Sequence, residues 1–326
     1  MTQNGTVAPD NLTENTSNPP NIPVGTTGVV IGKFMPPHRG HEYLAQFASA
    51  FVDKLWIFVC SLPGEPIPGE LRYQWMRALF PQAEVVHIHE VNPAANRNQH
   101  GAQGIWAQAV LRHTNSSPNF VFASEEYGWD FAKALGARFI PVDPSRDQFP
   151  ISGSELRRNP FRNWHFIPGV VRSYFVKEIG IRFTDANPMH AEDITQKAAL
   201  LLNTLYVPDY GAFYQQFSGS ELLPISADSL VRAQFSLIKA LKSQSRCFLL
   251  RILQARDQTN IQDSGVDLVL SLSMDHAESG SGMIDIDELN SPDNFGKITN
   301  LNINCSVNTA AHAIRDIILD HYKDLF

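Results

Sequence analysis

Residues 32–41 read GKFMPPHRGH, and this stretch decides the fold. An apolar run, Val29–Ile31, precedes it, and a helix-like pattern with Leu44, Phe47 and Phe51 follows it. The order predicts a strand, a tight turn and then a helix. A helix N-terminus carries unpaired N–H groups and the positive end of the helix dipole, so the predicted turn suits an anion.

Basic side chains crowd this predicted helix start, namely Lys33, His38, Arg39 and His41. Gly40 has no Cβ, which lets the backbone approach a ligand closely. The combination predicts a site for several phosphates, and nucleotidyl transfer is a reaction that needs one. Zinc binding by His38 and His41 is the alternative, but no third ligand at a suitable spacing accompanies them, so we assign no metal.

Composition limits the class of protein. The chain has 326 residues, which favours about two domains, and 43% hydrophobic residues, which suffice for ordinary cores. Its net charge of −7 gives no overall basic field, so we expect no nucleic-acid partner. The three cysteines, Cys60, Cys247 and Cys305, are far apart and lie in apolar runs, which indicates buried free thiols in a reducing compartment.

Targeting and membrane signals are not found in the sequence. No stretch approaches the roughly 20 apolar residues that a membrane-spanning helix needs, and residues 1–26 lack the features of a signal peptide. Those residues are rich in Asn, Thr, Pro and Gly, which predicts a disordered leader. We expect a cytoplasmic protein without a membrane partner.

Residues 27–176 alternate strand-like and helix-like segments, which predicts a doubly wound parallel sheet of the Rossmann-like kind, a class in which ligands bind at the carboxyl ends of the strands. The strand-like runs are Val29–Ile31, Leu55–Val59, Val85–Ile88, Phe120–Ala123 and Arg138–Val142. The helix-like segments between them are 41–52, 70–79, 104–112 and 129–135.

Residues 177–326 predict a second α/β domain. Its strand-like runs are Val176–Ile181, Arg246–Ile252, Val266–Leu272 and Leu301–Cys305, and its helix-like segments are 193–204, 227–242 and 308–325. Segment 274–297 is polar and contains Gly and Ser, so it is expected to be a long loop.

A second motif, ISGSELRR at 151–158, follows the last predicted strand of the first domain and opens a helix. Ser152 is placed to cap this helix, with Glu155 three residues on as in a capping box. Arg157 can bind a phosphate through its guanidinium fork. Two helix starts from opposite ends of one domain suggest a clamp for one polyphosphate.

Together the two motifs resemble the HxGH nucleotidylyltransferase superfamily. Within it, residues 152–175, SGSELRRNPFRNWHFIPGVVRSYF, resemble the NadR-type nicotinamide-nucleotide adenylyltransferases, which are often fused to a ribosylnicotinamide kinase domain. Further matches are Ser124–Glu126, Val142–Arg146 and Asn159–Trp164. The resemblance covers about residues 28–176.

The resemblance implies transfer of AMP from ATP to nicotinamide mononucleotide (NMN), with NAD and pyrophosphate as products. It implies catalytic roles for His38, His41, Lys33 and Arg157, and ATP contacts for Gly32, Phe34, Gly40, Ser152 and Ser154. A magnesium ion would accompany ATP, held mainly by phosphates and water. We also expect a homo-oligomer.

The nicotinamide end of the site is assigned to Trp106 and Arg72. Trp106 matches a family tryptophan suited to stacking on the pyridinium ring, with a half-buried core aromatic as the alternative. Arg72 would contact the NMN phosphate, with a solvent-exposed surface arginine as the alternative. The preference between NMN and its deamidated form stays open.

The second domain resembles a P-loop kinase that has lost its machinery. Residues 182–193 read RFTDANPMHAED where a P-loop would follow the strand, without its glycines and lysine. Ala212 replaces the arginine that follows the family's Tyr-Gly pair, and Arg251–Gln254 replace an acidic pair suited to Mg²⁺. We therefore expect an inactive, kinase-like domain that packs, oligomerises or regulates.

Two other functions remain open at this stage. One is adenylyl or cytidylyl transfer to another phosphate-bearing acceptor, and the other is a non-catalytic, nucleotide-sensing regulator.

Overall fold

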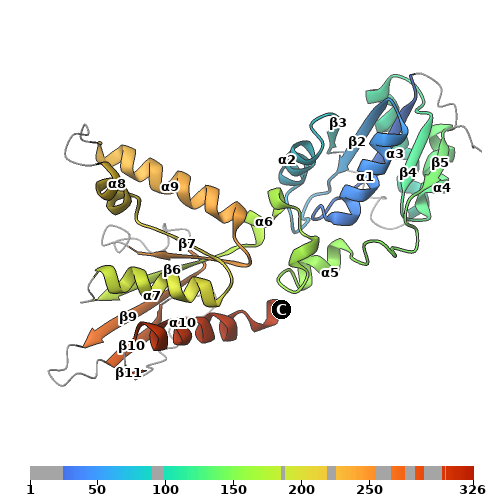
Figure 1. Ribbon diagram of the computed structural model, residues 1–326. Helices are drawn as coiled ribbons and strands as arrows, with labels where there is room; N and C mark the ends of the chain where they lie inside the picture. Colours follow the sequence, from blue (N-terminus) through green and yellow to red (C-terminus); the bar gives the residue numbers. More distant parts are fainter. Residues whose placement is uncertain are drawn as a thin grey trace, which may run out of the picture.

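The computed structural model describes residues 25–89, 99–184, 188–218, 225–253, 266–275, 283–289, 303–304 and 306–326. They form two lobes, each built on one β-sheet with helices packed against it (Figure 1). Within the described residues, no helix combines the length and apolar character that crossing a membrane requires. The cytoplasmic location stays a prediction.

The first lobe holds a five-stranded sheet in the order β3-β2-β1-β4-β5, with every pair parallel. Its strands are β1 (Thr27–Gly32), β2 (Lys54–Cys60), β3 (Glu84–Ile88), β4 (Phe120–Ala123) and β5 (Arg138–Pro141). Its crossover helices are α1 (Arg39–Phe51), α2 (Gly69–Leu79), α3 (Gln99–Thr114) and α4 (Tyr127–Leu135). The doubly wound parallel fold predicted from the sequence is confirmed.

Alternation along β1 places side chains on both faces of this sheet. Val30 packs with α1 and α2 through Leu44 and Met76, whereas Val29 packs on the other face with α3 and α4 through Val110 and Phe131. Because both faces are covered, the central strand is apolar throughout, as buried parallel strands are.

The second lobe holds a six-stranded sheet in the order β11-β10-β9-β6-β8-β7. Its strands are β6 (Lys177–Thr184), β7 (Leu205–Val207), β8 (Phe248–Ile252), β9 (Leu268–Asp275), β10 (Met283–Leu289) and β11 (Ile303–Asn304). Its helices are α7 (Pro188–Leu201), α8 (Tyr210–Ser218), α9 (Ala227–Gln244) and α10 (Val307–His321), followed by the short 3-10 helix η5 (Lys323–Leu325). Strands β7, β8, β6 and β9 pair in parallel, and β10 is antiparallel to both β9 and β11.

The expectation of one long loop over 274–297 is wrong where the chain is described. Strand β9 extends to Asp275, and residues 283–289, MIDIDEL, form β10 paired with it over seven residues. The acidic residues that made this segment look like a loop alternate with Ile284 and Ile286, and a period of two is the pattern of a strand. Helix α7 likewise begins at Pro188 rather than at 193, since proline is favoured in the first turn of a helix.

The segment after β5 lies between the two lobes (Figure 1). It contains α5 (Gly153–Arg158), the 3-10 helix η2 (Trp164–Phe166) and α6 (Gly169–Phe175). The Phe161 ring lies 5.1 Å from that of Phe248 in β8, and the Phe161 N–H donates to the Leu325 carbonyl at 3.2 Å. The segment that follows the second sequence motif therefore contacts the second lobe, and the predicted domain boundary near residue 176 stays a prediction.

Two of the three cysteines fall within the described residues. Cys60 and Cys247 are both free and buried, as expected, while Cys305 lies outside the described residues. The predicted leader, residues 1–26, lies almost wholly outside them as well.

Candidate functional site

A cavity of about 760 Å³ opens at the carboxyl ends of β1 and β4. These two strands are neighbours in the sheet although they are far apart in the chain, so the order of the strands reverses between them. Such a reversal leaves a crevice between the loops that follow the strands, and it is where parallel α/β sheets bind ligands. Residues 31–44 and 151–157 both contribute to the lining, so the fold brings the two sequence motifs together.

The loop after β1 is held in shape by Phe34. This residue has a φ of +47°, a left-handed backbone that is costly for a bulky side chain. Its ring is only 2% exposed and packs in the core of the first lobe, and a Cβ on Gly32 would approach the ring to 3.3 Å. Burial of the ring thus fixes the turn that carries Lys33 to the edge of the cavity.

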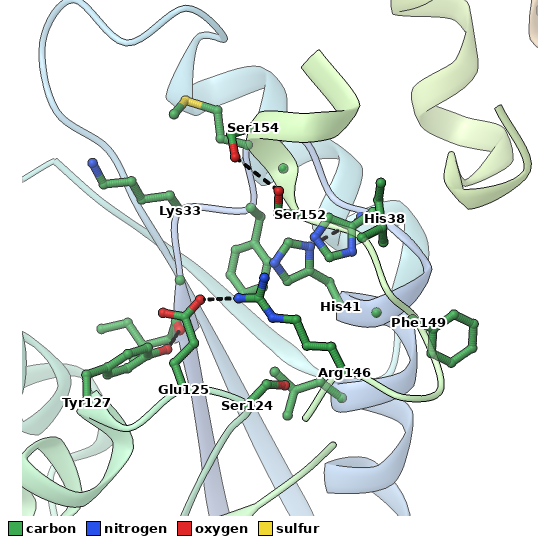
Figure 2. Close-up of a pocket in the computed structure, with 18 of the residues that line it drawn as sticks. Lys33, His38, His41, Ser124, Glu125, Tyr127, Arg146, Phe149, Ser152 and Ser154 are labelled. Carbon is green, nitrogen blue, oxygen red and sulfur yellow. Dashed lines mark hydrogen bonds and ion pairs between the residues drawn. The ribbon is translucent and has the colours of Figure 1, made fainter. Parts of the chain in front are cut away.

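His38 and His41 form one unit at the start of α1. His38 is the N-cap residue, and its backbone N–H donates to His41 Nδ1 at 3.3 Å. The two rings are 3.7 Å apart, and Figure 2 shows both in the cavity near Arg146. Because Nδ1 of His41 accepts a hydrogen bond, the proton of its neutral ring lies on Nε2, which makes that atom a hydrogen-bond donor.

Both imidazoles are neutral at ordinary pH. Burial, with Arg146 as the second cause, lowers the pKa of His38 to about 4. Burial, followed by His38 and Arg146, holds the pKa of His41 well below its ordinary value. His38 Nδ1 is buried without a hydrogen-bond partner, a state that costs about 1–3 kcal/mol and that a bound ligand would relieve.

Glycines bring the two motifs into close approach. A Cβ on Gly153 would lie 2.6 Å from the carbonyl oxygen of Met35, too close for any side chain. Arg157 strengthens this contact between the motifs, since its Nη1 also donates to the Met35 carbonyl. Within the first motif, a Cβ on Gly40 would lie 3.1 Å from the His38 ring. The clamp predicted from the sequence is thus a packed contact between residues 118 positions apart (35 and 153).

Ser152 and Ser154 present hydroxyls to the cavity (Figure 2). Ser152 Oγ accepts from the Glu155 N–H at 3.1 Å, which confirms the expected cap, and lies 3.0 Å from Ser154 Oγ. The capping box is not closed, because the Glu155 carboxylate accepts from Arg158 and Asn159 instead. Helix α5 has only six residues, so what this segment offers a phosphate is the two serine hydroxyls rather than a helix dipole.

Two basic side chains at the cavity are paired with carboxylates. Lys33 Nζ lies 3.0 Å from Glu65 Oε1, and Arg146 Nη2 lies 2.7 Å from Glu125 Oε1. The Arg146 and Glu125 side chains are 42% and 59% exposed, and an ion pair this open to solvent contributes about 0.2–1 kcal/mol, so an incoming phosphate can replace Glu125 at small cost. Lys33 is 52% exposed, but its partner Glu65 is only 9% exposed and also pairs with Arg72.

Trp106 lines the cavity in the middle of α3, which begins earlier than the predicted 104. It is partly buried and also packs against the core between α3, α4 and the sheet. The alternative interpretation, a half-buried core aromatic, describes this packing, and stacking on a pyridinium ring stays a prediction.

The expectation for Arg72 is corrected by the structure. Arg72 does not line the cavity, and it is 0% exposed, so it is neither an NMN contact nor a surface arginine. Its guanidinium donates to the carbonyls of Ile67 and Cys60 at 3.0 Å each, to that of Lys33, and to the Glu65 carboxylate. Its role is structural, since it ties the loops after β1 and β2 to α2.

Sequence reasoning missed Arg146 as a site residue. It follows β5 in a turn where Asp143 and Arg146 both have positive φ, and Asp143 Oδ1 accepts from the Asp147 N–H at 2.9 Å. That turn directs Arg146 toward the histidines (Figure 2). A signal for Arg146 was available in the sequence, because the segment Val142–Arg146 matches the family and directly follows a predicted strand. Other lining residues with no assigned role are Ser124, Glu125, Tyr127 and Phe149.

In the second lobe, an ion pair is buried near the amino end of β6. Glu178 on β6 is 5% exposed, and its carboxylate lies 2.9 Å from Arg251 Nε and 3.4 Å from Lys242 Nζ. Arg251, which stands where the family pattern expects an acidic residue, is therefore used in a buried ion pair. Of the stretch 182–193, residues 185–187 lie outside the described part, and Glu192 accepts from the Tyr206 hydroxyl at 3.2 Å.

Comparisons with known proteins agree with this geometry. No family model matches the chain. Over 207 residues it is 30% identical to the Trifunctional NAD biosynthesis/regulator protein NadR of Escherichia coli K12, an alignment that covers 58% of this chain and 50% of that protein. The protein of the same name from Salmonella typhimurium is 29% identical over 204 residues, covering 57% and 49%. The chain is therefore similar to NadR proteins over these residues. It spans about half the length of the curated NadR proteins it matches.

Crystal structures of NadR share the fold. The complex of NadR with NAD and AMP-PNP superposes with a TM-score of 0.59 and 17% identity, covering 76% of this chain and 81% of that one. The complex of NadR with NR gives a TM-score of 0.57 and 18% identity, covering 76% and 80%. Because the shared part is larger than either lobe, the NadR likeness in fold extends to both sheets.

Proposed function

We propose that the chain transfers the adenylyl group of ATP to NMN, giving NAD and pyrophosphate. The observation that carries this proposal is the convergence of His38, His41 and Arg146 with Ser152 and Ser154 in one cavity at the β1/β4 crevice. Similarity to NadR proteins, which are named for NAD biosynthesis, supports the choice of reaction.

The reaction is an in-line displacement at phosphorus. A 5′-phosphate oxygen of NMN attacks the α-phosphorus of ATP, a new P–O–P bond forms, and the bond to the β-phosphate oxygen breaks as pyrophosphate leaves with its electron pair. The protein forms no covalent bond in such a step, so positioning and neutralisation of charge supply the catalysis.

The side chains take roles that follow from their chemistry. His41 Nε2–H donates to an oxygen of the α-phosphate, where negative charge grows during the reaction. Lys33, Arg146 and Arg157 neutralise the polyphosphate, and the hydroxyls of the two serines donate to its β- and γ-end. Removal of one preorganised donor of this kind costs on the order of 10²–10³ in rate.

A magnesium ion would enter with ATP. Of the described residues that line the cavity, two are carboxylates, and both have partners: Glu125 pairs with Arg146, and Asp143 accepts from the Asp147 N–H. This donor set fits an ion held by phosphates and water, as Mg²⁺ commonly is in ATP sites. The ion supplies neutralisation of phosphate charge when bound.

The acceptor end of the cavity is assigned to Trp106, whose indole ring can stack on a cationic pyridinium. With Arg72 removed from the set, the Lys and Arg side chains available to the NMN phosphate among the described lining residues are Lys33, Arg146 and Arg157. We further propose that the second lobe has no ribosylnicotinamide kinase activity, because residues 182–193, RFTDANPMHAED, lack the glycines and the lysine of a P-loop.

An acceptor screen tests the proposal. The full chain with Mg-ATP is given NMN, deamido-NMN, ribosylnicotinamide or phosphopantetheine, and the products are separated by chromatography. A His41→Asn variant purified in parallel serves as the blank for contaminating host enzymes. We expect NAD from NMN in the wild type only. Adenylylation of another acceptor with no NAD formed would overturn the assignment, and any product from ribosylnicotinamide alone would overturn the inactive kinase lobe.

A further inference from the structure

Outside the ATP cavity, three potential metal ligands gather beside the edge strand β3. They are Glu70 in the first turn of α2, His87 on β3 and His89 just after that strand. One ligand atom from each lies within 4.8 Å of the other two. Among the described residues, these three form the one group of three or more His, Cys, Asp or Glu side chains that meets this spacing.

His87 is already held in a ligating orientation. Its side chain is 6% exposed, its Nε2 lies 2.9 Å from Ser61 Oγ, and its Nδ1 lies 3.4 Å from Glu70 Oε2. The Tyr73 ring stacks on it at 5.5 Å with an interplanar angle of 17°. A Cβ on Gly69 would come within 2.6 Å of His87 Nε2, so a glycine at this helix start leaves room for the ring.

The hydrogen bonds around His87 have a direction that suits a metal on Nδ1. If Nδ1 gives its lone pair to a cation, Nε2 keeps the proton and donates it to Ser61 Oγ. The Ser61 hydroxyl can in turn donate to the Ile88 carbonyl, which lies 3.4 Å away. Histidines that bind metals almost always donate their second N–H to an outer partner in this way.

His89 and Glu70 are exposed, and the His89 ring lies 3.6 Å from that of His87. Two imidazoles in contact, next to one carboxylate, bring two nitrogen ligands and one oxygen ligand to one point on the surface. Around a tetrahedral zinc ion with bonds of about 2.0–2.1 Å, ligand atoms lie about 3.4 Å apart. Small rotations of the two exposed side chains reach that spacing from the observed one.

We propose that Glu70, His87 and His89 bind one Zn²⁺ ion, with Ser61 orienting His87 and a fourth position left for water. Two imidazoles with a carboxylate are a ligand set suited to zinc, whereas Mg²⁺ and Ca²⁺ prefer oxygen ligands alone. The ion would join the start of α2 to the edge strand. This site is separate from the proposed adenylyl transfer and does not depend on it.

Titration of the metal-free full chain with ZnCl₂, followed by calorimetry and by metal analysis after gel filtration, tests the site. The two exposed ligands are replaced one at a time in the variants His89→Ala and Glu70→Ala. Circular dichroism checks that each variant folds. Ser61→Ala tests the outer partner, and His312→Ala, which removes an exposed histidine on α10, is the matched control.

The wild type should bind one zinc ion per chain at this site, and excess Mg²⁺ should not displace it. His89→Ala and Glu70→Ala should each weaken binding by more than the roughly 10–100-fold expected for Ser61→Ala. His312→Ala should bind zinc as the wild type does. Wild-type affinity in His89→Ala, or an equal loss in His312→Ala, would show that these residues are not the ligands and would overturn the proposal.

Discussion

The two lobes use their charged side chains differently. In the first lobe, β1 leads through a glycine turn into α1, and basic side chains face a cavity at the carboxyl ends of the strands. In the second lobe, Glu178 near the amino end of β6 pairs with Arg251 on β8 and with Lys242 in the last turn of α9. The comparison teaches that a parallel α/β architecture can turn its charged side chains either toward a cavity or toward one another.

The buried charges of the second lobe should matter for stability alone. Glu178→Gln leaves Arg251 and Lys242 without their carboxylate, and loss of one partner from a buried pair costs about 3–5 kcal/mol. Urea denaturation should show this loss, while the folded variant should keep its adenylyl-transfer rate. Asp320→Asn, which removes an exposed pair with Lys323, is the control and should change stability by less than about 1 kcal/mol. Unchanged stability in Glu178→Gln would break the comparison.

The proposed role of His41 is tested most directly by comparing two histidines that occupy the same position in two different helices. His41 is the third residue of α1, and His190 is the third residue of α7 and is exposed. His41→Ala should lower the rate of NAD formation by on the order of 10²–10³-fold, because a preorganised donor is lost. His190→Ala should leave the rate unchanged. Equal rates for His41→Ala and wild type would remove the proposed mechanism.

Close packing of the two motifs is tested with glycines. Gly153→Ala places a methyl group against the Met35 carbonyl, whereas Gly169→Ala, at the first residue of α6, meets nothing within 4 Å. We expect Gly153→Ala to lower kcat/KM for ATP by on the order of 10–100-fold, since small misplacements of catalytic groups are costly. Gly169→Ala should behave as wild type in the same assay.

The buried histidines predict a dependence of stability on pH. The pKa of His38 is about 4 in the folded chain and about 6.5 when unfolded, so the unfolded state binds more protons between these values. The free energy of unfolding should therefore be fully developed above pH 6.5 and fall as pH drops toward 4, by up to about 1.4 kcal/mol per pH unit. His38→Asn should reduce the slope in urea titrations, and His190→Ala should keep it.

The smallest effect is expected at the entrance of the cavity. Glu125→Gln removes the carboxylate that competes with phosphate for Arg146, and the KM for ATP should fall by up to about fivefold, since such exposed pairs are worth about 0.2–1 kcal/mol. Glu84→Gln, which removes an equally exposed pair with Lys54, should leave the KM unchanged. A rise in KM for Glu125→Gln would assign the carboxylate a binding role of its own.

The sequence predicted most of the first lobe because its signals are local. Strand-like runs of three to five residues predicted all five strands, and the rule that ligands bind after parallel strands brought residues 32–41 and 152–157 together. The place of Arg72 could not be predicted in this way. Its burial depends on three carbonyls and one carboxylate that come from separate loops, and charged residues are seldom fully buried without such partners.

Two other features escaped prediction for different physical reasons. Strand β10 was hidden because acidic residues that alternate in sequence with Ile284 and Ile286 make the segment polar when hydropathy is averaged. Arg146 was not assigned because its direction depends on positive φ values at Asp143 and Arg146, which single-residue preferences do not reveal.

One hydrophobic cluster contains Trp75 of α2, Phe161 and Trp164 of the connecting segment, and Leu250 and Ile314 of the second lobe. In evolutionary terms, this shared core ties the apolar residues of the second lobe to the segment that follows the cavity residues Ser152 and Ser154. A substitution that disturbs Leu250 or Ile314 would therefore be selected against through its effect on that segment, whatever reaction the second lobe performs.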